Sequence, residues 1–428
     1  MLTVRNILVA LICVSAVVVL WDELIVQGVV AGVAAVALAI AARTLRRDET
    51  GFLISVIRWP LLLAAIPAVW ILFQVLPLRI LAHPIWQSAG MTLQRPIAGA
   101  ISIDPAASII ALGHYLSLVA VALLSAAVAV DRKRAEWLLV ALCAAVTIIA
   151  LMVIAQDFFL AGGWPIAFAQ TQAIDCASLG TIIAAAEFIR AIERHEMRHA
   201  QQRAMPLASQ TFIPGTAALA VCGAALTLGA TPAVIFATAF GLLALVCQAI
   251  GRRFGLLGVA GVAVPALGIA VLLVATHSAQ RGTSAPIAFA EGAPPSLTAL
   301  NQRMLDDAPF AGTGAGTFAA LAPVYRGSDD PPSGPTAVTA AGAFAIELGK
   351  PMLGLITAAT AAAIVVLLRA SFRRGRDSFY SAMAGSCLIT LLLLAFTNAG
   401  LLGTATGLIA AVALGLGFTQ SKSRTASS

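Results

Sequence analysis

RMLDDAPFAGTGAGTFAALAPVYRGSDDPPSGPTAVTAAGAFAIELGKPMLG, residues 303–354, is a polar stretch in a chain whose flanking segments are apolar enough to dissolve in lipid. It includes the end of a polar loop from His277 to Pro335 and then enters a long hydrophobic run. Backbone without helical pairing is tolerated at membrane depth only where protein or water surrounds it. We therefore expect any chemistry on water-soluble groups to take place in this loop or just beneath it.

The composition of the whole chain indicates a membrane protein. Of its 428 residues, 60% are hydrophobic and 11% are charged, whereas about a quarter of the residues in soluble domains are charged. The mean hydropathy is +0.96, and hydrophobic runs long enough to cross a bilayer as helices recur along the chain. The expected fold is an all-α polytopic membrane protein with about twelve transmembrane helices and one large external loop between helices nine and ten.

The hydrophobic runs set the expected boundaries. The predicted spans are 7–20, 24–42, 59–78, 106–130, 137–155, 173–189, 212–228, 233–250, 256–275, 343–368, 380–396 and 402–418. Residues 1–276 then hold nine helices with short loops, residues 277–335 form the large periplasmic loop, and residues 336–428 hold three helices and a cytoplasmic tail.

The basic residues sort to one side of these spans. The chain has 26 Lys and Arg residues and a formal charge of +7. Most of them fall in alternate loops, including the runs 43–47, 132–134 and 369–376. This bias predicts that both termini lie in the cytoplasm and the large loop outside. Because topology explains the positive charge, nucleic acid is not an expected partner. The six cysteines lie in hydrophobic runs without a CxxC pair, which argues against a disulfide framework or a cysteine zinc site.

The large loop contains a predicted helix and a glycine-rich turn. In the segment 292–309, leucines and a methionine repeat at helical spacing, with Ser296 as the expected N-cap and Pro309 as the end. The turn that follows contains Gly312, Gly314 and Gly316, which allow the backbone to turn tightly and approach a ligand closely. The turn does not follow a strand, as a dinucleotide-binding turn would, so a nucleotide site is disfavoured.

The order of parts in this region resembles the signature region of the O-antigen ligase and O-antigen polymerase family. It comprises a helix ending in proline, a glycine-rich turn, Tyr325-Arg326, a Pro/Gly segment and a helix with Glu347-Leu348-Gly349 at the membrane edge. The early external segment with His83, Pro84 and Trp86, followed by ISIDP, is similar to that of polysaccharide-producing members. As a topology the similarity covers most of the chain, and as motifs it covers residues 303–354 and 83–105.

The resemblance implies a bacterial inner-membrane protein of surface or exopolysaccharide biosynthesis. Such proteins transfer or polymerise glycan from an undecaprenyl-diphosphate carrier to a glycan or lipid acceptor at the periplasmic face, as glycosyltransferases without a metal or other cofactor. Arginine suits this chemistry because its paired donors stay cationic as the leaving diphosphate gains charge. The catalytic residues expected on this basis are Arg303, Arg326, Glu347 and His277. The expected substrate-binding residues are Arg281, Gly312, Gly314, Gly316, Tyr325, Lys350 and His83.

Several readings stay open beside this one. Family members usually carry a His-Asn pair where this chain has Val338 and Thr339, and many carry Ser-Arg where it has Gly229-Ala230. A non-catalytic protein that binds or transports the same lipid-linked glycan is therefore the alternative. For the loop arginines the structural alternative is a solvated or salt-bridged side chain. For Glu347 it is an ion pair with Lys350, three residues later.

A literal H-E-x-x-H motif gives a remote third reading. His195 and His199 fall on one face of a helix with Glu196 beside them, as in a membrane zinc metalloprotease. Arg194 and Arg198 place positive charge next to any metal dication bound there, and no third ligand is evident. An arginine-rich helix at the membrane surface is the structural interpretation.

Overall fold

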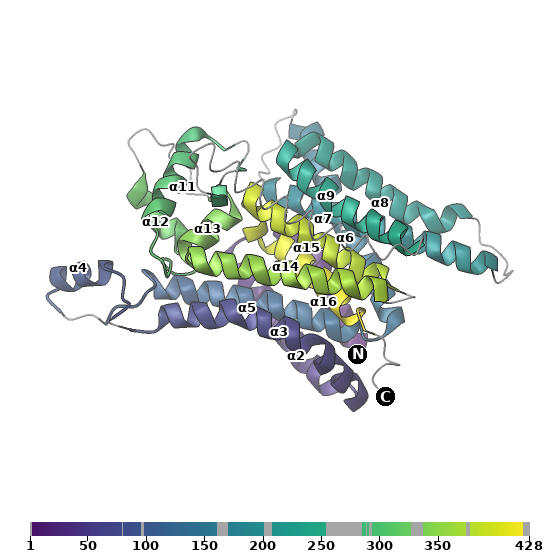
Figure 1. Cartoon of the computed structure of the whole chain (residues 1–428), viewed down its shortest axis with the longest axis horizontal. Coiled ribbons are helices and arrows are strands. Elements are labelled where there is room, and N and C mark those ends of the chain that lie inside the picture. The colour runs from purple at the N-terminus through teal and green to yellow at the C-terminus, as the bar shows by residue number, and fades with distance from the viewer. Residues whose placement is uncertain are drawn as a thin grey trace.

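The protein is a bundle of long helices (Figure 1). The computed structural model describes residues 2–78, 80–95, 98–160, 170–200, 208–253, 285–287, 289–290, 293–326, 337–373 and 377–422, and these contain no strand. The helices are α1 (Leu2–Val18), α2 (Leu24–Thr44), α3 (Arg47–Val75), α4 (Ile85–Thr92), α5 (Pro105–Val128), α6 (Arg132–Leu160), α7 (Gln170–Ala200), α8 (Ala208–Gly229), α9 (Pro232–Arg253), η2 (Ala285–Ile287), α11 (Pro295–Asp307), α12 (Phe318–Tyr325), α13 (Ala340–Glu347), α14 (Lys350–Arg373), α15 (Phe379–Thr397), η3 (Gly400–Leu402) and α16 (Thr404–Thr419).

Eight of these helices are long and apolar enough to cross a membrane, namely α2, α3, α5, α6, α7, α9, α14 and α15. Shorter apolar helices coincide with the spans expected at 7–20, 212–228 and 402–418. The expectation of a polytopic helical membrane protein is thus confirmed by length and composition. The span expected at 256–275 lies outside the described residues, so the total of about twelve stays a prediction.

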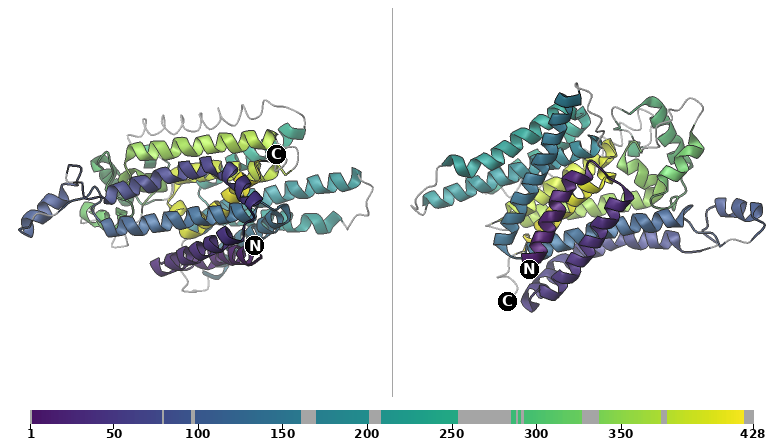
Figure 2. Two further views of the ribbon diagram at one scale, coloured as in Figure 1. Left: turned by 90° about the horizontal axis from the view of Figure 1, so that it is seen from below. Right: turned by 180° about the vertical axis from the view of Figure 1, so that it is seen from behind.

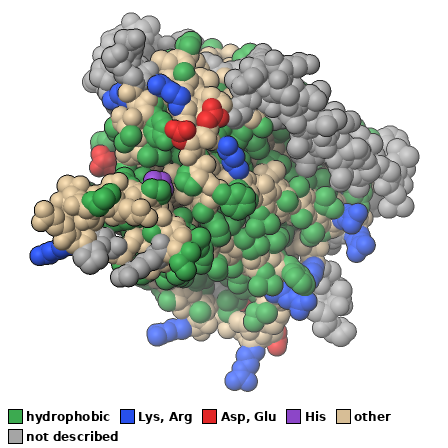
Figure 3. Space-filling view, turned by 60° about the vertical axis from the view of Figure 1, so that its left-hand side comes forward, with side chains coloured by type: hydrophobic (Ala, Val, Ile, Leu, Met, Phe, Trp, Pro, Cys, Tyr) green, Lys and Arg blue, Asp and Glu red, His purple; other side chains and the backbone are tan. Residues whose placement is uncertain are grey.

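Burial separates an inner set of helices from an outer set. Almost every residue of α15 and α16 is buried, whereas α2, α3 and α14 expose large apolar side chains such as Val36, Ile54 and Val366. Apolar side chains on an outer surface suit a lipid environment. Figure 3 shows such side chains covering the middle of one face, with Lys and Arg toward its margins.

Three short helices, α11, α12 and α13, called the loop helices below, gather at one end of the bundle. α11, α12 and α13 pack on one another through a small core of their own that includes Leu300, Met304, Phe318 and Ile346. The start of α1 and the end of α16 lie toward the other end in the views of Figures 1 and 2. The fold thus separates the loop helices from the first and last described helix ends, as the predicted topology requires. The location of each end relative to the cell stays a prediction.

The structure differs from the expected boundaries at two places. The predicted span 343–368 is broken, because α13 ends at Glu347 and α14 begins at Lys350. Gly349 between them has φ +91, and a Cβ there would lie 2.2 Å from the carbonyl oxygen of Phe310. The prediction of Ser296 as an N-cap is also wrong. α11 begins at Pro295, whose fixed φ and missing N–H favour the first helical position.

Candidate functional site

The glycine turn has the tight geometry that its sequence predicted. Gly312, Gly314 and Gly316 have φ of +76, +109 and +75, a region that favours glycine. A Cβ on Gly312 would lie 2.2 Å from the carbonyl oxygen of Glu347, and one on Gly314 would lie 2.2 Å from Ser102 Oγ. In the structure the turn therefore lies in close contact with other segments of the protein. A role for these glycines in ligand binding stays a prediction.

Backbone hydrogen bonds join the turn to the end of α13. The N–H of Thr313 donates to the carbonyl of Ile346 at 3.0 Å, and the N–H of Gly314 donates to that of Glu347 at 2.9 Å. Thr313 Oγ1 lies 2.9 Å from Thr317 Oγ1 and 3.2 Å from the Ile346 carbonyl oxygen. These contacts use carbonyls that the helix end leaves without an intrahelical partner.

Two side chains near the end of α3 complete this set of bonds. Trp70 Nε1 donates to the carbonyl of Leu348 at 2.9 Å. Gln74 Nε2 donates to the carbonyls of Ala311 and Glu347 at 2.8 and 2.9 Å. Sequence reasoning missed both residues. The available signal was a completely buried polar side chain, Gln74, close to the end of an apolar run, because such groups need partners.

The early external segment packs against the same turn. The N–H of Ile103 donates to the carbonyl of Thr313 at 2.9 Å, and Ser108 Oγ donates to that of Ala315 at 2.9 Å. Within the segment, Trp86 Nε1 donates to the carbonyl of Ser102 at 3.1 Å, which joins the start of the segment to its end. The two motif regions found in the sequence, 83–105 and 303–354, are therefore in direct contact.

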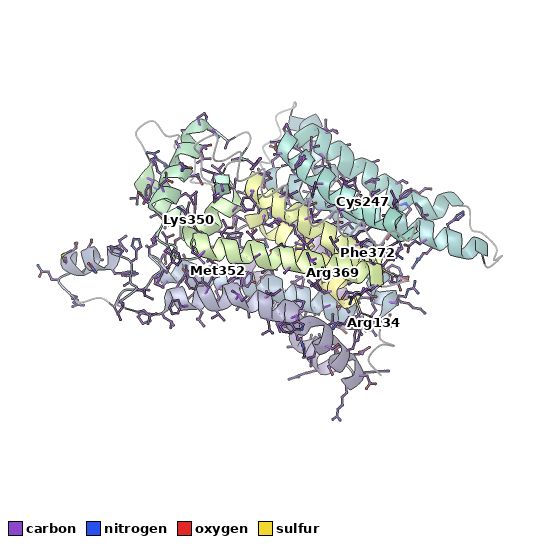
Figure 4. All side chains as sticks on the ribbon, in the orientation of Figure 1. Arg134, Cys247, Lys350, Met352, Arg369 and Phe372 are labelled. Carbon is purple, nitrogen blue, oxygen red and sulfur yellow. The ribbon has the colours of Figure 1, made fainter. Side chains whose placement is uncertain are left out.

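Glu347 lies at the centre of this arrangement. Its Oε1 accepts from the backbone N–H of Phe318, the first residue of α12, at 3.0 Å, and the backbone of Gly316 also donates to the carboxylate. Burial raises the pKa of Glu347 to about 7, and these two hydrogen bonds act in the opposite direction. No salt bridge between described residues joins it to Lys350, which is exposed at the start of α14 (Figure 4).

The predicted arginines lie on separate elements of the loop. Arg303 is on the exposed side of α11, with Nε 3.4 Å from the carbonyl oxygen of Ala299. Arg326 is half-buried and follows the last residue of α12. Beside it, burial and the hydrogen-bonded carboxylate of Asp307 raise the pKa of Tyr325. Convergence of the two guanidinium groups on a ligand stays a prediction.

Three further predicted residues, His83, His277 and Arg281, are not among the described contacts around Glu347. His277 and Arg281 lie outside the described residues. His83 is half-buried, and its Nδ1 accepts from the backbone N–H of Ile85 at 3.3 Å. Burial lowers the pKa of His83. Its contact with the glycine turn is indirect, through Ala100 and the segment that follows.

Val338 and Thr339, where the resemblance leads one to expect a His-Asn pair, have structural roles. Val338 is buried, and its N–H donates to Asn301 Oδ1 at 3.2 Å. Thr339 is the N-cap of α13 because its Oγ1 accepts from the N–H of Gly342 at 3.0 Å, and it donates to the carbonyl of Pro286 at 2.7 Å. These contacts connect α11, η2 and α13.

An apolar cavity lies beneath the loop helices. It has a volume of ≈ 430 Å³ and is bordered by α3, α5, α14, α15 and α16. Phe344 and Leu353, on either side of Glu347 in sequence, line it together with Leu401 and Phe418. A second cavity of ≈ 370 Å³ shares Tyr115 and Phe418 with the first and extends to Lys422. Tyr115 Oη donates to the carbonyl of Ala64 at 2.8 Å, which leaves the shared lining largely apolar.

The H-E-x-x-H motif lies only partly within the described structure. His195 is half-buried on α7, and the side chains of Glu196 and His199 lie outside the described residues. Within the described part of the chain, no group of three or more His, Cys, Asp or Glu side chains is arranged to hold a metal ion.

Comparison with protein-family models, with curated proteins and with solved structures finds no match to this chain.

Proposed function

We propose that this protein transfers or polymerises glycan carried on undecaprenyl diphosphate, at the periplasmic face of a bacterial inner membrane. The observation that carries the proposal is the contact between the early external segment and the glycine turn, with the carboxylate of Glu347 among them and an apolar cavity below. This arrangement suits a substrate with a polar head and a long apolar tail. The resemblance to O-antigen ligases and polymerases supports the same assignment.

The cavity supports the lipid part of the proposed substrate. On α16 its lining runs from Gly407, near the loop helices, to Phe418, near the other end of the helix. At about 1.5 Å of rise per residue, this stretch covers roughly 17 Å, more than half the thickness of a bilayer core. An isoprenoid chain in the cavity would therefore place its diphosphate beside α13 and the glycine turn.

Glu347 supports the proposed chemistry. A pKa of about 7 suits a general base at neutral pH. In the proposed step, the oxygen of an acceptor hydroxyl attacks the anomeric carbon and its proton passes to Glu347. The bond from that carbon to the diphosphate breaks, and its electron pair leaves with the diphosphate. Arg303 and Arg326 are proposed to stabilise the charge that develops on the leaving group.

A non-catalytic role in binding or transporting the same lipid-linked glycan is the second candidate. Its support comes from Val338 and Thr339, which hold the loop helices together where family members carry His-Asn. Both candidates need the lipid-binding cavity, but only the transferase needs a base.

Deleting the gene and profiling lipid-linked oligosaccharides tests both candidates together. We expect carrier-linked glycan to accumulate and surface glycan to change. Unchanged levels of both would contradict both candidates.

Glu347→Gln then separates the two roles, because the amide keeps an acceptor for the Phe318 N–H but cannot take a proton at neutral pH. If Glu347 is the base, this variant folds and binds lipid but loses activity by about a hundredfold or more. Full restoration of surface glycan by Glu347→Gln would favour the non-catalytic role.

A further inference from the structure

Asp175 is a completely buried carboxyl group near the start of α7, inside a candidate membrane span. Its Oδ1 accepts from Asn398 Nδ2 at 2.8 Å. Its Oδ2 is buried and has no hydrogen-bond partner among the described residues. No salt bridge between described residues includes Asp175. A neutral amide is therefore the donor that holds this carboxyl group in the described part of the chain.

Two other buried carboxylates of the bundle have a cation beside them. Asp377 pairs with Arg132 at 2.9 Å, and Glu187 pairs with Arg190. Each of these two acidic residues is 8% exposed, whereas Asp175 is 0% exposed. An ionised carboxylate that is removed from water without a counter-charge is so costly that the group takes a proton instead. The contacts of Asp175 therefore favour its protonated form.

The surroundings of Asp175 suit a proton rather than a metal ion. A Cβ on Gly400 would lie 2.5 Å from Asp175 Oδ2 and 2.7 Å from the carbonyl oxygen of Thr171, so the turn at Gly400 packs directly on the carboxyl group. Asp175 lines none of the cavities described above. A proton needs no cavity, and on Oδ2 it gives this oxygen a donor of its own.

The other titratable groups near Asp175 do not supply a counter-charge. Cys176, the next residue, is a thiol whose Sγ lies 3.6 Å from a threonine hydroxyl of α16. Asp22 is a carboxylate with its own donors, since Thr404 donates to it from Oγ1 at 2.6 Å and from its N–H at 2.9 Å. His114, on α5, interacts electrostatically with Asp22. η3 and α16, which pack against α7, contain no charged residue.

Asn398 connects Asp175 to the helix that carries Glu347. The Asn398 side chain donates to Asp175, and its Oδ1 accepts from the N–H of Gly400 at 2.8 Å. The Asn398 carbonyl accepts from the N–H of Ala340, the first residue of α13, at 2.8 Å. One residue at the end of α15 thus contacts α7, η3 and α13, so a movement of Asn398 is transmitted to the start of α13.

We propose that Asp175 binds a proton inside the bundle, and that this proton keeps Asn398 and the start of α13 in place. When the proton leaves to solvent, the buried carboxylate needs water or further donors. It gains them only if the turn from Asn398 to Gly400 opens. The N–H of Ala340 then loses its acceptor, and α13 is released. The proton site does not depend on the proposed glycan chemistry, although α13 also carries Glu347.

Infrared spectroscopy of the full chain, in a detergent without ester groups, detects the proton. Exposed carboxyl groups are ionised at pH 7, so absorption by protonated carboxyl groups comes from buried ones. We expect Asp175→Asn to remove part of this absorption. Glu23→Gln is the matched control, because Glu23 is exposed on the turn next to Asp22, and it should remove only absorption by ionised carboxylate. Loss of ionised-carboxylate absorption in Asp175→Asn would overturn the proposal.

Hydrogen exchange in nanodiscs tests the link to α13. After correction for intrinsic exchange, protection of the Ala340 amide in the wild type should fall with rising pH, by up to about tenfold per pH unit once Asp175 loses its proton. Asp175→Asn should keep this protection, because its amide accepts from Asn398 and carries a donor in place of the acid proton. Glu23→Gln should behave as the wild type. Equal falls in the wild type and Asp175→Asn would overturn the link.

A second variant covers the case in which Asp175→Asn does not fold. Glu347→Gln removes the other carboxyl group that the loop helices bury, and Asp175 is unchanged in it. We expect absorption by protonated carboxyl groups to persist in Glu347→Gln at pH 7. Absence of this absorption would overturn the proposal without any substitution of Asp175.

Discussion

The two polar ends of this bundle are built in different ways. At the glycine turn, backbone groups pair with backbone groups or with fixed side chains such as Trp70 and Ser108, and Glu347 accepts from backbone N–H groups. At the other end, called the arginine end below, long charged side chains such as Arg132 and Arg194 pair with carboxylates across helices. Hydrogen bonds to backbone groups have a fixed direction and hold neighbouring segments rigidly. Ion pairs between long, flexible side chains hold their helices less rigidly. We therefore expect substitutions at the glycine end to cost much more stability than those at the arginine end.

The largest effect is expected from Gly349→Ala. The residue has φ +91, and a Cβ would lie 2.2 Å from the Phe310 carbonyl oxygen. Both strain and overlap oppose the new side chain, so the loss of stability should exceed about 3 kcal/mol. Thermal unfolding of the purified protein in nanodiscs measures it.

Gly354→Ala is the matched control for this substitution. Gly354 lies five residues further along, within α14, and a Cβ there would meet nothing within 4 Å. Alanine is a better helix former than glycine, by about 1 kcal/mol, so this variant should be as stable as the wild type or slightly more so. Similar destabilisation by both variants would contradict the rigid junction inferred between α13 and α14.

A pH dependence of stability is expected next in size. Burial raises the pKa of Glu347 from its ordinary value of 4.5 to about 7. Between these values the folded protein holds a proton on Glu347 that the unfolded chain releases, so the contribution of Glu347 to stability is greatest below pH 4.5 and is lost as the pH rises to 7. This group contributes about 2–3 kcal/mol to the fall. Denaturant titrations between pH 4.5 and 7 measure the free energy of unfolding of the wild type and of Glu347→Gln. This free energy should fall more steeply with pH in the wild type, and the same pH dependence in both would show that Glu347 is not the cause.

A smaller effect is expected at Trp70. Trp70→Phe keeps an aromatic ring but removes the hydrogen bond of 2.9 Å to the Leu348 carbonyl, at a cost of about 1 kcal/mol. Trp59→Phe on the same helix is the control, because Trp59 is 61% exposed. Chemical unfolding of both variants measures the difference. Equal stabilities would mean that α3 does not hold the junction of α13 and α14.

The smallest effect is expected at the arginine end. Arg194→Gln removes its ion pair with Glu136, and the two side chains are 30% and 26% exposed. Partly exposed pairs contribute about 0.5–1 kcal/mol, and salt screens them. The decrease in melting temperature that this substitution causes should therefore be smaller at high salt than at low salt. A loss as large as that of Gly349→Ala would remove the contrast between the two ends.

The sequence predicted the helices better than the junctions between them. Run length and apolar composition located the long helices, because a bilayer sets their minimum length. The glycine turn was also predicted, since three glycines in five residues indicate unusual backbone. The break between α13 and α14 was missed because Ile346, Leu348 and Met352 continue an apolar pattern across it, although Gly349 and Pro351 were visible.

The candidate site was only partly predictable for a different reason. Motif order named Glu347, the glycines and the early segment as parts of one site, and the structure brings them into contact. The contacts of Trp70, Gln74 and Ser108 join residues more than 200 positions apart. No local pattern contains such pairings, because they depend on how the helices pack. The local sequence also did not show that Thr339 is the N-cap of a helix, at a position where the resemblance leads one to expect part of a His-Asn pair.

Recognition of the diphosphate by the two loop arginines is tested by comparing the binding of undecaprenyl diphosphate and undecaprenyl monophosphate to the purified chain in phosphatidylcholine nanodiscs. We expect the diphosphate to bind at least about tenfold more tightly, because it forms additional charge-assisted hydrogen bonds. We also expect Arg303→Ala combined with Arg326→Ala to abolish this preference. Equal affinity for the two lipids, or a preference that survives the double substitution, would contradict the proposed function.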